Sequence, residues 1–150
     1  MAQSLAKILT HIVFSTKKRQ HWLHKEICKE LYPYINKILE NQKCHSYQIG
    51  GISDHIHIVC ALGKTVSASK LIEEIKTSTS KWIKTKDESF ANFYWQNGYG
   101  IFSVSQTHLD ALNNYVANQE INHKTSIFQD EFIRLLQKNN VAYDEKYLWD

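Results

Sequence analysis

Two histidines, His55 and His57, alternate with isoleucines in residues 54–59. In a β-strand successive side chains point to opposite faces, so both imidazoles project to one side and Ile56 and Ile58 to the other. Two adjacent imidazoles can hold one metal ion, or they can be two hydrogen-bonded histidines on a sheet surface. Their strand is the most apolar of the chain, where an unpaired polar group costs about 1–3 kcal/mol. Each histidine therefore needs a partner.

A second group of polar residues lies further along the chain. Tyr115, Gln119 and His123 are spaced by four, which places them on one face of a helix. On that face Tyr115 can present its hydroxyl beside the amide of Gln119. The alternative is a face without chemistry, on which Tyr115 packs against Leu112 and Val116 while Gln119 is solvated.

The elements that must position these residues follow from hydrophobic periodicity. Pro33 is expected to kink or divide the first helix. Strand-like runs cover residues 5–15, 44–52, 54–62 and 93–104, and helical spacing covers residues 22–41, 67–86, 109–123 and 128–137. The order β-α-β-β-α-β predicts an α+β fold of the ferredoxin-like or RRM-like kind. In that fold two helices cover one face of an antiparallel sheet, the other face is free for a ligand, and here C-terminal helices follow.

Length and composition limit the protein class. The 150 residues correspond to one domain, residues 1–150, and 43% of them are hydrophobic, which excludes intrinsic disorder. No apolar run reaches the roughly 18 residues of a membrane span, and no secretory signal is visible at the N-terminus. The three cysteines lack zinc-finger spacing and are expected to be buried thiols. We therefore expect a cytoplasmic protein that is not bound to a membrane.

The charge is divided unevenly along the chain. Residues 1–86 carry 14 Lys and Arg against 6 Asp and Glu, a balance of +8, whereas residues 87–150 carry 4 against 9, a balance of −5. This asymmetry favours a polyanionic partner for the first part, the alternative being two solvated faces that differ by chance. Cationic side chains neutralise phosphates and aromatic ones stack on exposed bases. The candidate DNA contacts are Lys17, Lys18, Arg19, Trp22, Lys76, Lys81 and Lys84.

The two polar groups together resemble a known family. The run His55-Ile56-His57 is similar to the His-hydrophobic-His motif of the HUH nucleases, and residues 115–119, with His123 after them, resemble the tyrosine helix of the single-tyrosine HUH transposases. These are the small transposases of simple insertion sequences and their REP-associated relatives. The resemblance extends over nearly the whole chain, from residues 10–16 through Gly51 and residues 95–105 to the tyrosine helix, in the family's order.

The resemblance implies an activity. Family members cut and rejoin single-stranded DNA at sites marked by imperfect hairpins, leaving a 5′-phosphotyrosine and a free 3′-hydroxyl. Tyr115 would be the nucleophile, while His55, His57 and Gln119 would hold Mg²⁺ or Mn²⁺, with His123 adjacent to the site. A free tyrosine has a pKa of about 10, so its attack requires an electrophile that is already polarised, and a bound ion supplies this. Imidazoles, however, often select zinc or copper, so the choice of Mg²⁺ or Mn²⁺ comes from the family alone.

The resemblance also implies partners and a layout. We expect a homodimer acting on hairpin DNA in a bacterial or archaeal cytoplasm, with the tyrosine helix at about residues 107–124 and a C-terminal helix and tail at 127–150. The aromatic residues in 143–150 predict a tail that docks on the domain. Family members often have a glycine just before the tyrosine helix, whereas residues 105–107 here are Ser-Gln-Thr. Whether the site is assembled within one chain or between two is therefore open.

Two rival functions fit the same residues. One is a non-catalytic single-stranded DNA or RNA binding module that uses the RRM-like sheet. The other is a metallohydrolase in which bound water attacks in place of Tyr115. A covalent protein–DNA adduct separates the transposase from both.

Overall fold

The computed structural model describes residues 2–149 and contains one four-stranded antiparallel sheet in the order β2-β3-β1-β4. The strands are β1 (Leu9–Ser15), β2 (His45–Ile52), β3 (His55–Ala61) and β4 (Gly100–Ser103). The helices are α1 (Lys25–Asn41), α2 (Ala68–Lys84), α3 (Leu109–Ala117), α4 (Gln119–Asn122), α5 (Phe128–Lys138) and α6 (Glu145–Leu148). Short 3₁₀ turns η1 (Lys17–Arg19), η2 (Glu88–Phe90) and η3 (Gln106–His108) join them. The predicted ferredoxin-like α+β fold is confirmed.

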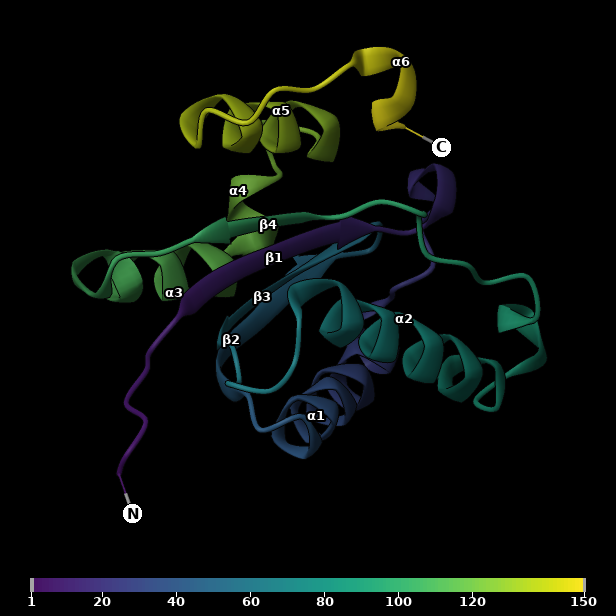
Figure 1. Cartoon of the computed structure of the whole chain (residues 1–150). Coiled ribbons are helices and arrows are strands. Elements are labelled where there is room, and N and C mark those ends of the chain that lie inside the picture. The colour runs from purple at the N-terminus through teal and green to yellow at the C-terminus, as the bar shows by residue number, and fades with distance from the viewer. Residues whose placement is uncertain (1, 150) are drawn as a thin grey trace.

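The two central strands, β1 and β3, divide their side chains between two cores. Ile12 and Phe14 of β1, with Ile56 and Ile58 of β3, belong to the main core, which lies between the sheet and helices α1 and α2. Figure 1 shows these two helices below the sheet and α5 above it. The opposite face carries Val13 and the alternating histidines of β3, because the side-chain period of a strand is two. The predicted separation of the histidines from the isoleucines is confirmed.

Helices α1 and α2 begin at capping residues. The ring of His24 accepts a hydrogen bond from the amide of Ile27, and the hydroxyl of Ser67 accepts one from the amide of Lys70. Pro33 lies inside α1, which runs unbroken from Lys25 to Asn41. The expectation that Pro33 divides this helix is therefore wrong.

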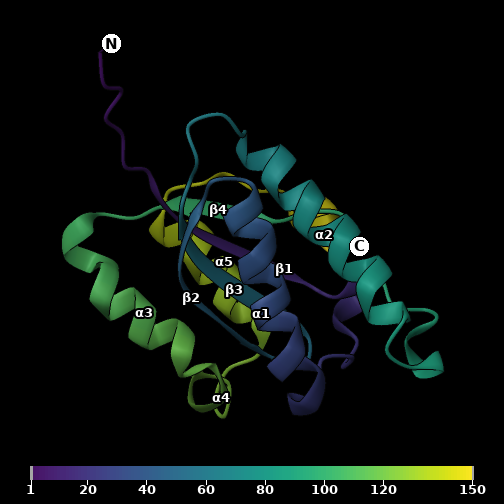
Figure 2. The ribbon, with the colours of Figure 1, turned by 90° about the horizontal axis from the view of Figure 1, so that it is seen from below.

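The second sheet face, which the sequence pattern leaves free, is covered by the C-terminal helices. Helix α3 packs Leu112 and Val116 against Val59 of β3. Helix α5 packs Phe128 and Phe132 over Val13 and Phe102, together with Leu136. In Figure 2, seen from below, α3 lies beside β2 while α5 lies behind the sheet. This face of the sheet is therefore largely covered, whereas the sequence pattern predicts an open one.

The residue bounds of the first and last predicted strands need correction. The first strand starts at Leu9 instead of residue 5, since Leu5 is 84% exposed and has nothing to pair with in the sheet. The last strand is confined to Gly100–Ser103, with one isolated bridge between Thr16 and Trp95. Between these pieces, the side-chain oxygen of Gln96 takes the place of a backbone partner by accepting from the amide of Ser15 at 2.7 Å. The predicted run 93–104 is thus mostly loop.

The predicted tyrosine helix at residues 107–124 is interrupted. Asn118 leaves helical geometry, with φ −107° and ψ 32°, and separates α3 from α4. Asparagine side chains compete with the backbone for helix carbonyls: Asn118 Nδ2 donates to the carbonyl of Asn114, and Asn122 Nδ2 donates to that of Tyr115. These side-chain bonds lie at the break, where the amide of Asn118 is shared between the carbonyls of Asn114 and Tyr115.

The predicted docking of the C-terminal tail is confirmed for the residues described. The ring of Trp149 lies 6.4 Å from that of Phe128 and 6.0 Å from that of Phe132, and the guanidinium of Arg19 lies 5.2 Å from it. Asp150 and Met1 lie outside the described residues. Among residues 2–149 no helix is long and apolar enough to cross a membrane.

We expect Gly50→Ala to destabilise the fold by about 2 kcal/mol, because an added methyl group would clash where β2 and α3 are in close contact. A Cβ on Gly50 would lie under 3.0 Å from the backbone carbonyl of Val116, so α3 would have to move off β2. The matched control is Gly98→Ala, whose added Cβ meets only the side chain of Gln96, at 3.8 Å. Thermal unfolding of both variants measures the difference, and equal midpoints would contradict the tight docking of α3.

Candidate active site

His55 and His57 are fully buried in the central strand β3, and each has a partner on its Nδ1 atom. Nδ1 of His55 lies 2.7 Å from a carboxylate oxygen of Asp54. Nδ1 of His57 lies 2.8 Å from Nε2 of His11, which projects from β1 onto the same face. These contacts fix the orientation of both rings, so that their Nε2 atoms face the space under α5.

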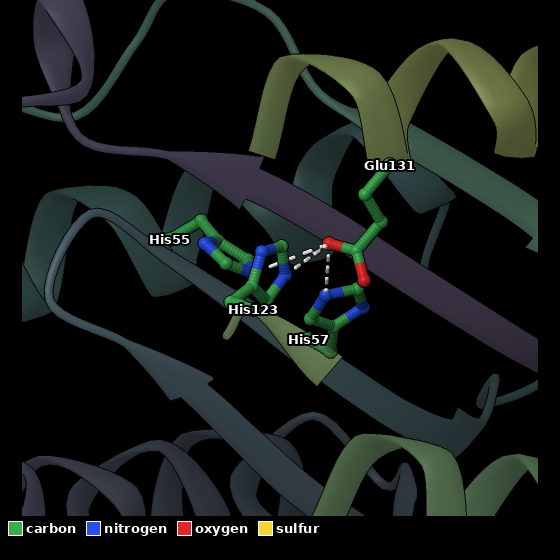
Figure 3. Close-up of side chains that lie close together, drawn as sticks. All are labelled: His55, His57, His123 and Glu131. Carbon is green, nitrogen blue, oxygen red and sulfur yellow. Dashed lines mark hydrogen bonds and ion pairs between the residues drawn. The ribbon is translucent and has the colours of Figure 1, made fainter. Parts of the chain in front are cut away.

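Glu131 of α5 occupies the centre of that space. Its Oε1 lies 3.0 Å from Nε2 of His57, 3.0 Å from Nε2 of His123 and 3.3 Å from Nε2 of His55. Figure 3 shows the carboxylate extending from α5 toward the three imidazoles, with one oxygen joined to all of them. The carboxylate is 1% exposed. It therefore joins two strand histidines to one that follows α4.

The tyrosine and glutamine reach the same carboxylate from α3 and α4. The hydroxyl of Tyr115 donates to Oε2 of Glu131, and Nε2 of Gln119 lies 3.3 Å from the same oxygen. Oε1 of Gln119 lies 2.9 Å from Nε2 of His55. The predicted residues Tyr115, His55, His57, Gln119 and His123 thus meet in one place, and all belong to one chain.

The electrostatics of the cluster are dominated by burial and by Glu131. Burial alone would raise the pKa of Glu131, but hydrogen bonds from the three imidazoles hold it well below its usual range. Burial opposes the charge on His55, yet its hydrogen bonds to Asp54 and Glu131 prevail and raise its pKa to about 9. Burial lowers the pKa of His57. Burial and the neighbouring Glu131 raise the pKa of Tyr115, so its phenol is protonated in this arrangement.

The cluster can hold a metal ion. The ligand atoms of His55, His57, His123 and Glu131 all lie within 4.8 Å of one another. Two metal–ligand bonds of about 2.1 Å span at most about 4.2 Å, so binding requires only a slight contraction. Imidazole nitrogens and carboxylate oxygens are ordinary ligands of divalent ions. This donor set suits a divalent ion and includes two of the predicted ligands, His55 and His57, while the third, Gln119, lies beside His55.

Two hollows open the cluster to solvent. One, of about 730 Å³, lies between α3 and α5 and is lined by Tyr115, Glu131 and Arg134, among others. The second, of about 480 Å³, lies on the α4 side and is lined by the same three residues together with His123. Tyr115 and Arg134 therefore face solvent on two sides.

The predicted DNA contacts fall into separate places. Lys17, Lys18 and Arg19 follow directly after Thr16, whose amide donates to the carbonyl of Asp54 at 2.8 Å, so they lie at the histidine end of the sheet. The α2 lysines lie on the opposite side of the sheet (Figure 1). Trp22 packs against Phe90 and Phe93 and is half-buried.

The α2 lysines differ in how far they are engaged within the fold. Lys76 donates to the carbonyls of Gln96 and Gly98, so its ammonium holds the loop before β4. Lys84 lies over the ring of Tyr94 at 4.4 Å, while Lys81 is exposed. Of these three lysines, Lys81 is the one whose charge is directed to solvent.

Two members of the cluster, Glu131 and His11, were not among the residues predicted from sequence. The sequence does contain an indication that Glu131 is a site residue. Glu131 lies at helical spacing among Phe128, Phe132 and Leu135, so its carboxylate interrupts the apolar stripe of an amphipathic helix. A charge in such a position must be paired, which marks it as a candidate site residue. His11 has a weaker signal, as a histidine inside an apolar strand.

Comparison with known proteins identifies the family of this chain. The sequence model described as "Transposase IS200 like" matches residues 4–119, so the chain belongs to the IS200-like transposase family, as the motifs predict. No curated protein gives a significant match.

Two solved structures share the fold. A candidate transposase from Deinococcus radiodurans R1 has a TM-score of 0.62 and 16% identity, covering 79% of this chain and 98% of that one. A REP-associated tyrosine transposase, solved bound to a REP hairpin, has a TM-score of 0.62 and 15% identity, covering 96% of this chain and 91% of that one.

Proposed function

We propose that this transposase cleaves and rejoins single-stranded DNA at hairpin-marked ends through a covalent 5′-phosphotyrosine on Tyr115. The observation that carries the proposal is the position of Tyr115, which lines both hollows and whose hydroxyl donates to Glu131 at the centre of the histidine cluster. A tyrosine that merely packed on the sheet would not direct its hydroxyl to this cluster.

The reaction is a transesterification. The oxygen of Tyr115 forms a bond to phosphorus, the bond from phosphorus to the 3′-oxygen breaks, and the 3′-oxygen takes up a proton while the phenol loses one. The phosphotyrosine keeps the ester, so a 3′-hydroxyl can reverse the step and rejoin DNA without a nucleotide cofactor. Arg134, which lines both hollows, is placed to contact the scissile phosphate.

His55, His57 and Gln119 are the proposed holders of a divalent ion, Mg²⁺ or Mn²⁺. Such an ion would neutralise phosphate charge and stabilise the departing 3′-oxygen. Asp54 and His11 orient the two imidazoles through their Nδ1 atoms. We also propose that the protein acts as a homodimer, as its family resemblance implies.

For the DNA contacts, we propose Lys17, Lys18 and Arg19 as the contacts nearest the site, with Trp22, Lys76, Lys81 and Lys84 further from it. Ser15 pairs with His55 across the sheet, and Lys17 is two residues further along the chain. Both lysines of this turn are exposed. A phosphate bound here lies close to the histidine end of the sheet.

We expect Lys17→Gln/Lys18→Gln to weaken hairpin binding about tenfold and to reduce the slope of log affinity against log salt by about 1.5, because two phosphate contacts are lost. The matched control is Lys29→Gln/Lys37→Gln on α1, which removes the same charge from two exposed positions. Fluorescence anisotropy across a salt series measures both. An equal loss in the control would contradict a local contact and indicate a general charge effect.

The function is tested by incubating the protein with hairpin-bearing single-stranded DNA and Mn²⁺ and separating the products under denaturing conditions. The transposase predicts a protein–DNA adduct whose peptide maps to Tyr115, together with a free 3′-hydroxyl fragment. Binding without cleavage would indicate the non-catalytic module. Cleavage without an adduct would indicate hydrolysis by water.

A further inference from the structure

Glu131 brings the possible ligand atoms of the cluster together. Its Oε1 lies 3.0 Å from Nε2 of His57, 3.0 Å from Nε2 of His123 and 3.3 Å from Nε2 of His55, whose nearer partner is Oε1 of Gln119 at 2.9 Å. The other oxygen accepts from Tyr115 and Gln119. Three imidazole nitrogens and one carboxylate oxygen, all within 4.8 Å of one another, are the donor set of a metal site.

The outer partners of the imidazoles point the same way. Nδ1 of His55 faces the carboxylate of Asp54, and Nδ1 of His123 lies 2.6 Å from the carbonyl of Ser126. Both partners only accept, so in each neutral ring Nδ1 carries the hydrogen and Nε2 keeps its lone pair. An Nε2 lone pair that faces a carboxylate oxygen is repulsive unless a proton or a metal ion lies between them. Metal-binding histidines have this arrangement of an outer acceptor and an inner lone pair.

Helix α5 holds Glu131 in place. Phe128 and Phe132 pack on Val13 and Phe102, and Trp149 covers them from the tail. The family match ends at residue 119, so neither His123 nor Glu131 is assigned by it. The carboxylate is thus a firmly positioned group that this chain adds to the site.

We propose that Glu131 and His123 are metal ligands together with His55 and His57, and that these three imidazoles and one carboxylate select a first-row transition metal over Mg²⁺. The inference rests on the metal site of the proposed function and deepens it. Imidazole suits Mn²⁺, Co²⁺ and Zn²⁺ better than Mg²⁺, which prefers an all-oxygen shell and keeps its waters. Gln119, with Oε1 beside His55, is the remaining oxygen donor.

The test is metal binding by the protein without DNA. Titration calorimetry should show Mn²⁺ and Co²⁺ binding at least about 100-fold more tightly than Mg²⁺, and bound Co²⁺ should give a visible spectrum of low-symmetry nitrogen and oxygen coordination. Glu131→Gln and His123→Gln should each weaken Mn²⁺ binding by about tenfold or more and alter the Co²⁺ spectrum. The matched control is Asp130→Asn, an exposed acid next to Glu131 on the same helix.

The outcomes are distinct. Wild-type affinity and an unchanged spectrum in both variants would overturn the ligand assignment, and equal affinity for Mg²⁺ and Mn²⁺ would overturn the metal preference. If Glu131→Gln does not fold, the Mn²⁺ affinity of His123→Gln tests the ligand assignment, and the wild-type affinities for Mn²⁺ and Mg²⁺ test the metal preference. A wild-type protein that binds Mn²⁺ as expected but forms no DNA adduct would contradict the proposed function and leave this inference standing.

Discussion

Tyr115→Phe is expected to abolish the covalent protein–DNA adduct, a loss of roughly 10³-fold or more, while hairpin binding changes little. The substitution removes only the hydroxyl, which is the atom proposed to attack phosphorus. The ring is retained, and its contacts with His57 and with the small core of α3 remain available. Glu131 keeps its three imidazole partners, so the site should stay assembled.

The matched control for this variant is Tyr147→Phe, because Tyr147 is 75% exposed on α6 and its hydroxyl is remote from any described site contact. It should form the adduct at the wild-type rate. The measurement is adduct yield with time on denaturing gels, with DNA binding followed separately. An adduct that persists in Tyr115→Phe would place the nucleophile elsewhere, and persistent cleavage without an adduct would favour attack by water.

The strand that carries the histidines was predictable because a strand has a short, local period. Alternation of His55, Ile56, His57 and Ile58 assigns each side chain to a face before any partner is known. The structure keeps that assignment, with the isoleucines in the main core and the histidines opposite. Local periodicity thus identified half of the site.

The other half depends on contacts between distant segments. His57 and Glu131 are separated by 74 positions, and periodicity does not say which helix closes over which face. The sequence pattern therefore left the second face free, whereas packing of Phe128 and Phe132 on Val13 and Phe102 closes it. A buried carboxylate on the apolar stripe of α5 is the signal that a search for unpaired charges would have found.

The break at Asn118 shows a different limit. The spacing of Tyr115, Gln119 and His123 predicts that they lie close together on one helix. They do lie close together, but helix α3 ends at Ala117 and holds only the first of them. The side chains of Asn118 and Asn122 bond to backbone carbonyls in competition with the helix, an effect that a spacing pattern does not contain. The residues still converge because Gln119 begins α4 directly after the break.

His57→Ala is expected to abolish cleavage while hairpin binding remains largely intact. His57 is fully buried, and its Nε2 is one of the atoms proposed to hold the divalent ion, whereas the cationic residues proposed to contact DNA lie on η1 and α2. The truncation also leaves a cavity and removes a partner from His11 and Glu131, which should lower stability by about 2–4 kcal/mol. The assay is therefore run well below the measured unfolding midpoint of the variant.

His45→Ala, at an exposed position of the neighbouring strand β2, removes an imidazole without touching the cluster and should cleave normally. Chelation of metal from the wild-type protein should stop cleavage to the same extent as His57→Ala, and added Mn²⁺ should restore the wild type but not the variant. Cleavage that survives both chelation and the loss of His57 would remove the metal from the mechanism. Cleavage lost in His57→Ala together with DNA binding would show instead that the substitution had disrupted the fold, a result that the unfolding midpoint and the binding measurement identify independently.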